Sequence, residues 1–233
     1  MATGFEAVVL AGGLGTRLAS KLSGIPKAMA PIAGMPFLEI LLGQLERAGC
    51  GRALLSVGHL HACIQSHFGA AFRGMELEYV IEDSPLGTGG AIRKALGQVT
   101  RDSALMVNGD TFLEADYGAM LGFHSAEGAG LTIAVTRGSD VARYGGVLIE
   151  NGRIVGFEEK GRSGPGWINA GAYVLPKDLD WPPNLPEKFS FETDFLAAEI
   201  GRLAPAAYKV DGFFLDIGVP EDLERAQTAL ARF

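Results

Sequence analysis

The chain has 233 residues and a formal net charge of −7 at pH 7. This length fits one large domain with a substantial core, and the acidic balance with scattered cations argues against a nucleic acid or a membrane surface as partner. The only cysteines, Cys50 and Cys63, suggest a reducing compartment rather than a disulfide framework. Because the sequence shows no leader pattern and no apolar run near the ~20 residues of a membrane span, we expect a cytoplasmic protein.

The first half of the chain alternates short apolar runs with amphipathic segments. Strands are predicted at residues 7–10, 52–57, 77–81, 104–107 and 131–136. Helices are predicted between them at residues 37–48, 61–68, 89–96 and 117–125. This alternation is typical of βαβ units, so the sequence predicts an α/β fold with a Rossmann-like, mixed and mostly parallel sheet flanked by helices.

The second half departs from this alternation at Asn151-Gly152, a strong hairpin signal between the predicted strands 147–150 and 153–157. A small antiparallel substrate lobe is therefore expected before the next strand, at residues 168–174. Helices at 191–202 and 220–232 complete the predicted elements. Since no linker or repeat divides the sequence, we expect a single domain over 1–233, with an N-terminal half to about residue 135 and a C-terminal half from about 136.

A glycine-rich loop follows the first predicted strand and contains Gly12, Gly13 and Gly15. Glycine lets the backbone approach a ligand closely, so consecutive N–H groups can converge on phosphate oxygens. Arg17 adds a guanidinium that matches phosphate geometry. The loop lacks the Lys-Ser or Lys-Thr pair of a P-loop and the third glycine of a dinucleotide fingerprint. It predicts a triphosphate site, with an ordinary strand-to-helix turn as the alternative.

Acidic residues end two of the predicted strands. Asp110 follows Asn108-Gly109 after one strand, and Asp216 ends a short apolar strand near the C-terminus. Open α/β sheets bind ligands at the carboxyl ends of their strands, and Mg²⁺ prefers one or two carboxylates plus substrate oxygens. We therefore expect both aspartates to bind Mg²⁺. The alternative is that each aspartate only accepts hydrogen bonds from backbone N–H groups of its own turn.

Matching motifs between residues 7 and 221 resemble the sugar-1-phosphate nucleotidyltransferases. They are residues 12–18 with Pro26 and Lys27, 85–90, 108–110, 158–160, 169–171 and 216–218. Residues 143–145, 187–192 and 214–222 look most like the D-glycero-α-D-manno-heptose 1-phosphate guanylyltransferases. The resemblance implies a GT-A-like nucleotidyltransferase fold, whose N-terminal half binds nucleotide and whose C-terminal half binds sugar phosphate.

The resemblance implies transfer of GMP from GTP to a heptose 1-phosphate, giving GDP-heptose and pyrophosphate for surface polysaccharide synthesis. A sugar phosphate is largely dianionic near neutral pH, because its second pKa is about 6, so it attacks without a general base. The enzyme then has to position two anions and neutralise their charge. The alternatives are a mannose 1-phosphate guanylyltransferase, another sugar-1-phosphate nucleotidyltransferase, or a non-catalytic subunit that binds nucleotide sugar. Relatives often assemble as dimers or tetramers, so a homodimer is also expected.

The family pattern also implies individual roles. Arg17 and Lys27 are expected to act on the phosphates, with Asp110 and Asp216 binding Mg²⁺. The expected nucleotide-binding residues are Leu10, Ala11, Gly12, Gly13, Gly15, Thr16, Glu82, Pro85, Gly87, Thr88, Asn108 and Gly109. The expected sugar-phosphate residues are Tyr144, Gly146, Glu159, Lys160, Asn169, Gly171, Lys188 and Glu192. Arg143 is a further candidate for reading the sugar.

Glu82 bears on the choice of base. Relatives that use thymidine or uridine triphosphates usually have glutamine here, which can both donate and accept hydrogen bonds. An ionised glutamate only accepts, and guanine offers N1–H and an amino group as neighbouring donors. We therefore predict that Glu82 helps to select guanine, directly or through water. The alternative is an exposed charge near a turn.

Overall fold

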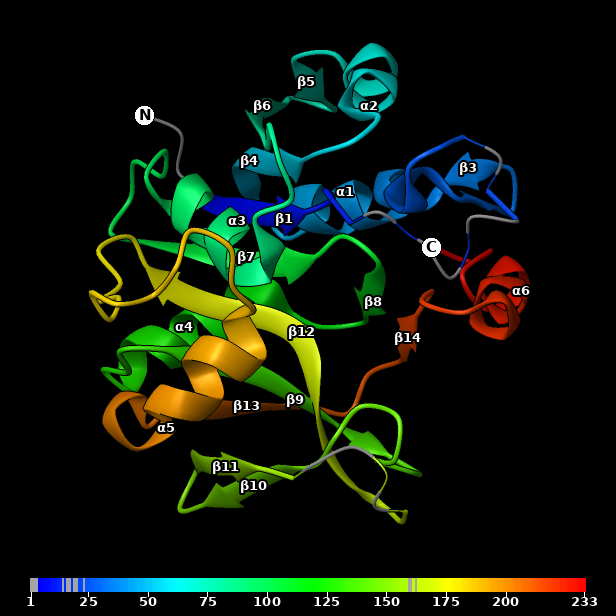
Figure 1. Cartoon of the computed structure of the whole chain (residues 1–233). Coiled ribbons are helices and arrows are strands. Elements are labelled where there is room, and N and C mark those ends of the chain that lie inside the picture. The colour runs from blue at the N-terminus through cyan, green and yellow to red at the C-terminus, as the bar shows by residue number, and fades with distance from the viewer. Residues whose placement is uncertain are drawn as a thin grey trace.

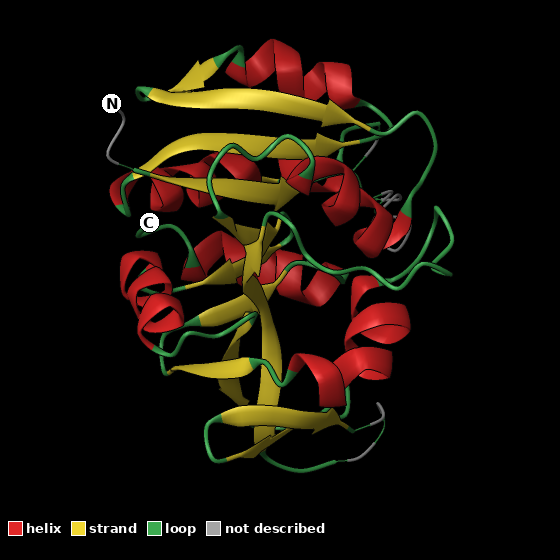
Figure 2. Ribbon diagram, turned by 90° about the vertical axis from the view of Figure 1, so that its left-hand side faces the viewer, coloured by secondary structure: helices red, strands yellow, loops and turns green. Residues whose placement is uncertain are grey.

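A ten-stranded mixed sheet runs through the protein, and helices cover both of its faces (Figures 1 and 2). The computed structural model describes residues 4–13, 15, 18, 21–22, 24–158, 161 and 163–233. In spatial order the strands are β10 (Val147–Glu150), β11 (Arg153–Phe157), β13 (Ala206–Val210), β9 (Thr132–Gly138), β12 (Gly166–Pro176), β7 (Ser103–Asn108), β1 (Phe5–Leu10), β4 (Cys50–Val57), β6 (Met75–Ile81) and β5 (Ala71–Phe72).

Strand directions explain where a ligand site forms. β1 pairs in parallel with β4 and β7, and β4 pairs in parallel with β6, so the carboxyl ends of these four strands lie at one edge. β12 lies antiparallel between β7 and β9. The predicted β10–β11 hairpin is present and is continuous with the main sheet, because Arg153 pairs with Ala206 of β13. The predicted α/β fold class, a mixed sheet flanked by helices, is confirmed.

Side chains of β1 alternate between two cores, as expected for a strand buried on both faces. Ala7 and Val9 pack in one core, which contains apolar residues of α1, α2 and α4. Val8 packs in the other core, which contains apolar residues of α3 and of the helical segment that precedes α5. Figure 1 shows α5 in front of the sheet and α6 at its right-hand side.

The helices confirm most of the predicted segments. They are α1 (Phe37–Arg47), α2 (His61–Phe68), α3 (Gly87–Leu96), α4 (Tyr117–Ala126), α5 (Ala197–Leu203), α6 (Pro220–Ala229), the short 3₁₀-helix η2 (Lys27–Met29) and the π-helix η3 (Phe191–Leu196). The segment predicted as one helix at 191–202 is thus a π-helix followed by an α-helix. Strand β13 was not predicted, because Pro205 and Asp211-Gly212 leave only five residues between turn signals. No helix formed by the described residues is long and apolar enough to span a membrane.

A separate two-stranded ribbon brings the C-terminal segment to the carboxyl edge of the main sheet. β8 (Thr111–Leu113) pairs with β14 (Phe214–Asp216), which places Asp216 opposite Thr111. A third core beneath the ribbon contains Phe112, Leu215 and apolar residues of α6. The remaining strands, β2 (Pro31–Ile32) and β3 (Met35–Pro36), form a small hairpin before α1. The ribbon therefore places Asp216 next to the turn that holds Asp110.

Candidate active site

The turn after β7 places Asp110 beside Asp216. The Gly109 N–H donates to the Leu10 carbonyl at 3.0 Å, and a Cβ on Gly109 would lie only 2.6 Å from that oxygen. Glycine is required for this close approach. The Ile217 N–H then donates to the Asp110 carbonyl at 3.0 Å, which holds the segment after Asp216 against the turn. The structure therefore brings the two predicted metal ligands together.

Lys27 completes this cluster of charges. Its Nζ donates to Asp110 Oδ2 at 2.6 Å, and its side chain is only 13% exposed, whereas that of Asp110 is 39% exposed. Gly15, in a left-handed conformation at φ +58°, packs close to the Lys27 side chain, because a Cβ there would lie 3.0 Å from Lys27 Cβ. Lys27 is therefore not an ordinary solvated charge but part of the acidic cluster.

The electrostatics of Asp216 fit a cation site. Burial raises the pKa of Asp216, and the nearby Asp110 carboxylate raises it further. Lys27, Arg143 and the Gly218 N–H oppose this shift. Two adjacent carboxylates that repel each other present the oxygen ligands that Mg²⁺ prefers. The residues present thus fit a magnesium ion, which Asp110 and Asp216 would hold.

A first cavity of about 270 Å³ opens beside Asp110. It is lined by Leu10, Gly12, Gly13, Glu82, Pro85, Gly87, Thr88, Ala91, Asn108 and Asp110. All of these except Ala91 were predicted site residues. Ala11 is buried next to it, with its N–H donating to the Ser56 carbonyl at 2.8 Å. Thr16 and Arg17, which were predicted to bind the triphosphate, lie outside the described residues. We call this space the nucleotide cavity.

Glu82 is fixed at the wall of the nucleotide cavity. Its Oε1 accepts a hydrogen bond from Ser56 Oγ, and its Oε2 accepts one from the Leu86 N–H, each at 3.1 Å. A Cβ on Gly12 would lie 2.6 Å from Glu82 Oε1, so the glycine makes room for the carboxylate. The side chain is partly buried, which makes the alternative of a merely exposed charge wrong. Its role in selecting guanine stays a prediction.

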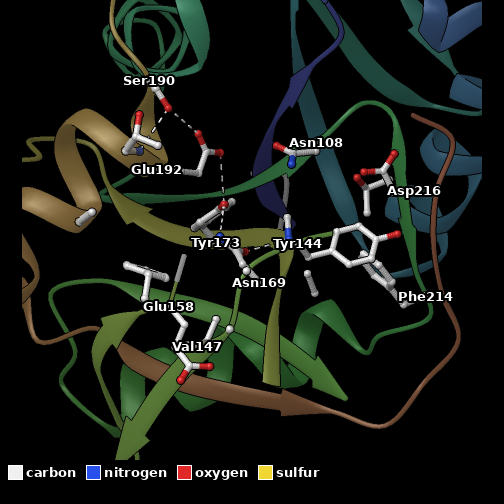
Figure 3. Close-up of a pocket in the computed structure, with 18 residues that line it drawn as sticks. Asn108, Tyr144, Val147, Glu158, Asn169, Tyr173, Ser190, Glu192, Phe214 and Asp216 are labelled. Atoms are coloured by element: carbon white, nitrogen blue, oxygen red, sulfur yellow. Dashed lines mark hydrogen bonds between the residues drawn. The ribbon is translucent and has the colours of Figure 1, made fainter. Parts of the chain in front are cut away.

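A second, larger cavity of about 570 Å³ lies between β12, η3 and the β14 segment (Figure 3). The labelled side chains show Asp216 and Tyr144 at one side of it and Ser190 and Glu192 at the other. It is lined by Asn108, Thr111, Tyr144, Gly145, Gly146, Val147, Phe157, Glu158, Asn169, Ala170, Gly171, Tyr173, Ser190, Glu192, Thr193, Ala197, Phe214 and Asp216. We call this space the sugar cavity.

Five of the eight predicted sugar-phosphate residues line the sugar cavity. They are Tyr144, Gly146, Asn169, Gly171 and Glu192. Glu159 and Lys160 lie outside the described residues. Lys188 is exposed and does not line the cavity, so the structure does not support its predicted role. Its neighbour Phe189 is buried, so the two adjacent residues differ in exposure.

Asn108 is the residue at which the two cavities meet, because it lines both of them. Gly171, at φ +70°, approaches it so closely that a Cβ there would lie 2.7 Å from Asn108 Nδ2. Asn108 Oδ1 is buried and has no hydrogen-bond partner among the described residues. A buried acceptor of this kind calls for an explanation, and a ligand group that donates to it would provide one.

The structure adds two residues to the site: Arg143, which the sequence linked only to the sugar, and Tyr173, which the sequence did not indicate. Arg143, a candidate for reading the sugar, contacts the acidic cluster: its Nη2 lies 3.7 Å from Asp216 Oδ1, and its Nη1 donates to Asp222. Tyr173 was not predicted; it lies four residues after Asn169 on β12, with a register shift between the two. Asn169 Nδ2 donates to the Tyr173 hydroxyl at 2.7 Å.

Comparisons with known proteins agree with this geometry. The family model described as nucleotidyl transferase matches residues 6–232. The D-glycero-alpha-D-manno-heptose 1-phosphate guanylyltransferase of Aneurinibacillus thermoaerophilus is 40% identical over 98% of this chain and 99% of its own. The protein of the same name from Campylobacter jejuni is 40% identical over 93% of this chain and 96% of its own.

Solved structures give the same result. The crystal structure of HddC from Yersinia pseudotuberculosis, complexed with GMP-PN, superposes with a TM-score of 0.83 at 38% identity, over 97% of this chain and 99% of that one. A likeness this extensive in both sequence and fold covers both cavities and the acidic cluster between them. The chain therefore belongs to the nucleotidyl transferase family.

Proposed function

We propose that this protein transfers GMP from GTP to D-glycero-α-D-manno-heptose 1-phosphate, giving GDP-heptose and pyrophosphate. The observation that supports this most directly is the meeting of two cavities at Asn108, beside Lys27, Asp110 and Asp216. One cavity then holds the nucleotide and the other holds the sugar, with the phosphates of both substrates at the acidic cluster. The names of the two bacterial relatives support heptose and guanine as the substrate choice.

In the proposed reaction an oxygen of the sugar phosphate attacks the α-phosphorus of GTP. The new P–O bond forms as the bond between the α-phosphorus and the bridging oxygen to the β-phosphate breaks, and pyrophosphate leaves with that electron pair. The nucleophile is already an anion, so the site needs no general base. The work of the protein is to align the reacting groups and to reduce repulsion between them.

Three described side chains fit these tasks. Lys27 is largely buried and places a positive charge beside Asp110, where it would stabilise charge that accumulates on the α-phosphate. Asp110 and Asp216 would hold Mg²⁺, which when bound supplies positive charge to the phosphate oxygens. Asn108, between the cavities, would hold groups of both substrates in register. We also propose a cytoplasmic location, since Cys50 and Cys63 are free thiols that suit a reducing compartment.

The test measures pyrophosphate release and GDP-heptose formation by the purified protein with GTP, MgCl₂ and heptose 1-phosphate. We expect turnover that stops with EDTA and returns when Mg²⁺ is added in excess. Asp216→Asn is expected to lower kcat by about 10²-fold or more, because it removes a charge that binds the metal. The exposed Asp178→Asn is the matched control and is expected to keep full activity.

Other outcomes would contradict defined parts of the proposal. Faster turnover with mannose 1-phosphate would contradict heptose as the acceptor, and a preference for ATP, UTP or dTTP would contradict guanine as the base. Nucleotide binding without turnover of any sugar 1-phosphate would indicate a regulatory subunit. Size-exclusion chromatography with light scattering would test the predicted homodimer.

A further inference from the structure

One hydroxyl group joins the walls of the two cavities. Thr88 lies in the first turn of α3 and lines the nucleotide cavity, while Glu192 lies in the π-helix η3 and lines the sugar cavity. Thr88 Oγ1 donates to Glu192 Oε2 at 2.8 Å. The same Oγ1 accepts a hydrogen bond from the Phe191 N–H at 2.8 Å. Thr88 thus holds both the start of η3 and the first polar side chain on it.

These two hydrogen bonds leave the Thr88 side chain poorly suited to bind phosphate. A hydroxyl has one donor and two acceptor sites. The donor is used by Glu192, and one acceptor site is used by Phe191. Phosphate oxygens only accept hydrogen bonds, so they need a donor that this hydroxyl no longer has. Although Thr88 lines the nucleotide cavity, its hydroxyl makes its hydrogen bonds to Glu192, a residue of the sugar cavity, and to Phe191 beside it.

Glu192 is held by donors from three parts of the chain. Besides Thr88, Ser190 Oγ donates to its Oε2 at 3.2 Å, and the Tyr173 hydroxyl donates to its Oε1 at 3.5 Å (Figure 3). A carboxylate has about four acceptor sites, so about one stays available to a donor in the cavity. A sugar hydroxyl is such a donor. The orientation of Glu192 therefore decides whether that hydroxyl meets an acceptor.

The packing of α3 against the segment before η3 makes the contact between Thr88 and Glu192 close. Cβ atoms on Gly87 and Gly90 would lie 2.4 Å from the carbonyl oxygens of Phe189 and Glu187, respectively. The Gly89 N–H also donates to the Phe189 carbonyl at 3.0 Å. Glycines on both sides of Thr88 thus let the segment before η3 lie directly on the start of α3. Residues 87–90 therefore form the surface on which the segment before η3 packs, and this segment leads into one wall of the sugar cavity.

We propose that Thr88 is a positioning residue for the sugar 1-phosphate: its hydroxyl fixes the Glu192 carboxylate so that the carboxylate accepts a hydrogen bond from a hydroxyl of the sugar. This inference rests on the proposed function, because it takes the larger cavity as the sugar site. Thr88 lines the nucleotide cavity, yet by this inference it affects the binding of the sugar 1-phosphate and not that of GTP. Removal of the hydroxyl should therefore weaken sugar binding and leave GTP binding unchanged.

The test compares Thr88→Val, which removes the hydroxyl at nearly constant shape, with Thr88→Ser, which keeps it. For Thr88→Val we expect the KM for heptose 1-phosphate to rise about tenfold or more, since a hydrogen bond to a charged group is disturbed. The KM for GTP should stay near the wild-type value, because the Thr88 hydroxyl has no donor left for a phosphate oxygen. Thr88→Ser should restore a near-wild-type KM for the sugar phosphate. The exposed Thr228→Val in α6 is the matched control.

A double-mutant cycle with Glu192→Gln tests whether Thr88 acts through Glu192. Glu192→Gln alone should also raise the KM for heptose 1-phosphate. If Thr88 acts only by positioning Glu192, the double variant should be no worse than the more impaired single variant, because residues of one network are not additive. Glu192→Gln also keeps the inference testable if Thr88→Val does not fold.

The results that would overturn this inference differ from the result that would contradict the proposed function. A rise in the KM for GTP that equals or exceeds the rise for heptose 1-phosphate would overturn the inference, as would an unchanged sugar KM in folded Thr88→Val or in Glu192→Gln. Additive effects in the double variant would also overturn it. Absence of turnover by the wild-type protein would instead contradict the proposed function, so the two failures are told apart by the wild-type assay.

Discussion

Lys27 Nζ donates to Asp110 Oδ2 at 2.6 Å, although 83 residues separate the two in the sequence. The ammonium group thus lies at the carboxyl end of the central parallel strands, where it offsets part of the negative charge of the acidic cluster. This hydrogen bond and the low exposure of the Lys27 side chain, 13%, fix the position of the ammonium group. Such preorganisation is what makes electrostatic stabilisation of a transition state effective.

The first prediction concerns Lys27→Ala. We expect kcat to fall by about 10²- to 10³-fold, as for loss of one preorganised donor to a developing charge. The KM values should change much less. The fold should persist, because Asp110 is 39% exposed and can be solvated when its partner is removed. Steady-state kinetics and thermal unfolding measure both effects.

Lys21→Ala provides the control for that prediction. Lys21 pairs with Glu224 at 3.1 Å, and both side chains are more than half exposed, so its loss should affect neither kinetics nor stability measurably. An unchanged kcat in Lys27→Ala would remove Lys27 from the mechanism.

The second prediction concerns Glu82→Gln and the choice of base. Glutamine can keep both local contacts, because its carbonyl oxygen can accept from the Leu86 N–H while its amide donates to Ser56 Oγ. Stability should therefore change little. The preference for GTP over the other triphosphates should fall by about tenfold or more, because a charged acceptor for guanine is lost. Competition among the four triphosphates measures this ratio.

Glu76→Gln is the matched control, since Glu76 lies on the same strand β6 and is exposed. It should leave base preference unchanged. If Glu82→Gln retains the wild-type preference, Glu82 does not select the base, and its hydrogen bonds to Ser56 and Leu86 are purely structural.

The third prediction compares two glycines, one where alanine should destabilise the protein and one where alanine should stabilise it. Gly87→Ala should destabilise the protein by about 1–3 kcal/mol, since alanine is strained at positive φ. Here φ is +70°, and the new Cβ would also lie 2.4 Å from the Phe189 carbonyl oxygen. Gly122→Ala, in an exposed position of α4 with no atom near the new Cβ, should stabilise by about 0.4–1 kcal/mol. Thermal unfolding without ligand should give Tm shifts of opposite sign. Equal signs would contradict the conformations assigned to these positions.

The fourth prediction concerns Glu6, a buried carboxylate in β1 that is remote from the cavities. Burial by itself would raise its pKa, but hydrogen bonds from the Arg101 N–H, the Arg52 guanidinium and Thr100 outweigh burial and lower the pKa below its usual value of 4.5. Between its folded and unfolded pKa values, the unfolded chain binds more protons than the folded protein. The stabilisation is therefore fully present above pH 4.5 and is lost as the pH falls through the folded pKa.

Glu6→Gln should lower the free energy of unfolding at pH 7 by about 1–3 kcal/mol, because a charge-assisted network is weakened. It should also flatten the decline in stability below pH 4.5. Urea unfolding at several pH values measures both effects. The exposed Glu150→Gln in β10 should show the wild-type pH dependence, and a Glu6→Gln curve parallel to the wild-type curve would contradict the assignment.

Much of the fold could be predicted because its signals are local. The helix at 61–68 and the two hairpin strands have the predicted bounds, since residue periodicity and the Asn151-Gly152 turn define them within a few residues. The β8–β14 ribbon was harder: β8 has three residues, and its partner lies about a hundred residues later in the chain. The π-helical start of the 191–202 segment was also missed, because apolar spacing does not distinguish a π-turn from an α-turn.

The candidate site likewise has residues that could be predicted from the sequence and residues whose positions only the structure shows. Carboxylates at strand ends pointed to Asp110 and Asp216, and the family resemblance pointed to Lys27 and Glu82. The sequence did not give the positions of Arg143 beside Asp216 or of Tyr173 beneath Asn169. The contact of Arg143 with Asp216 depends on how separate elements pack, and that of Tyr173 with Asn169 depends on the register shift within β12 between these two residues.

The sequence by itself determined the order of elements, the positions of the glycine turns and the residue types available at the carboxyl edge of the sheet. These follow from backbone preferences and hydrophobic periodicity, which act over a few residues. Only the tertiary structure decided which of these residues meet: Asp110 with Asp216 through the β8–β14 pairing, and Thr88 with Glu192 through the packing of α3 on η3. Contacts between such distant positions depend on burial and strand pairing of the whole chain, which no local pattern specifies.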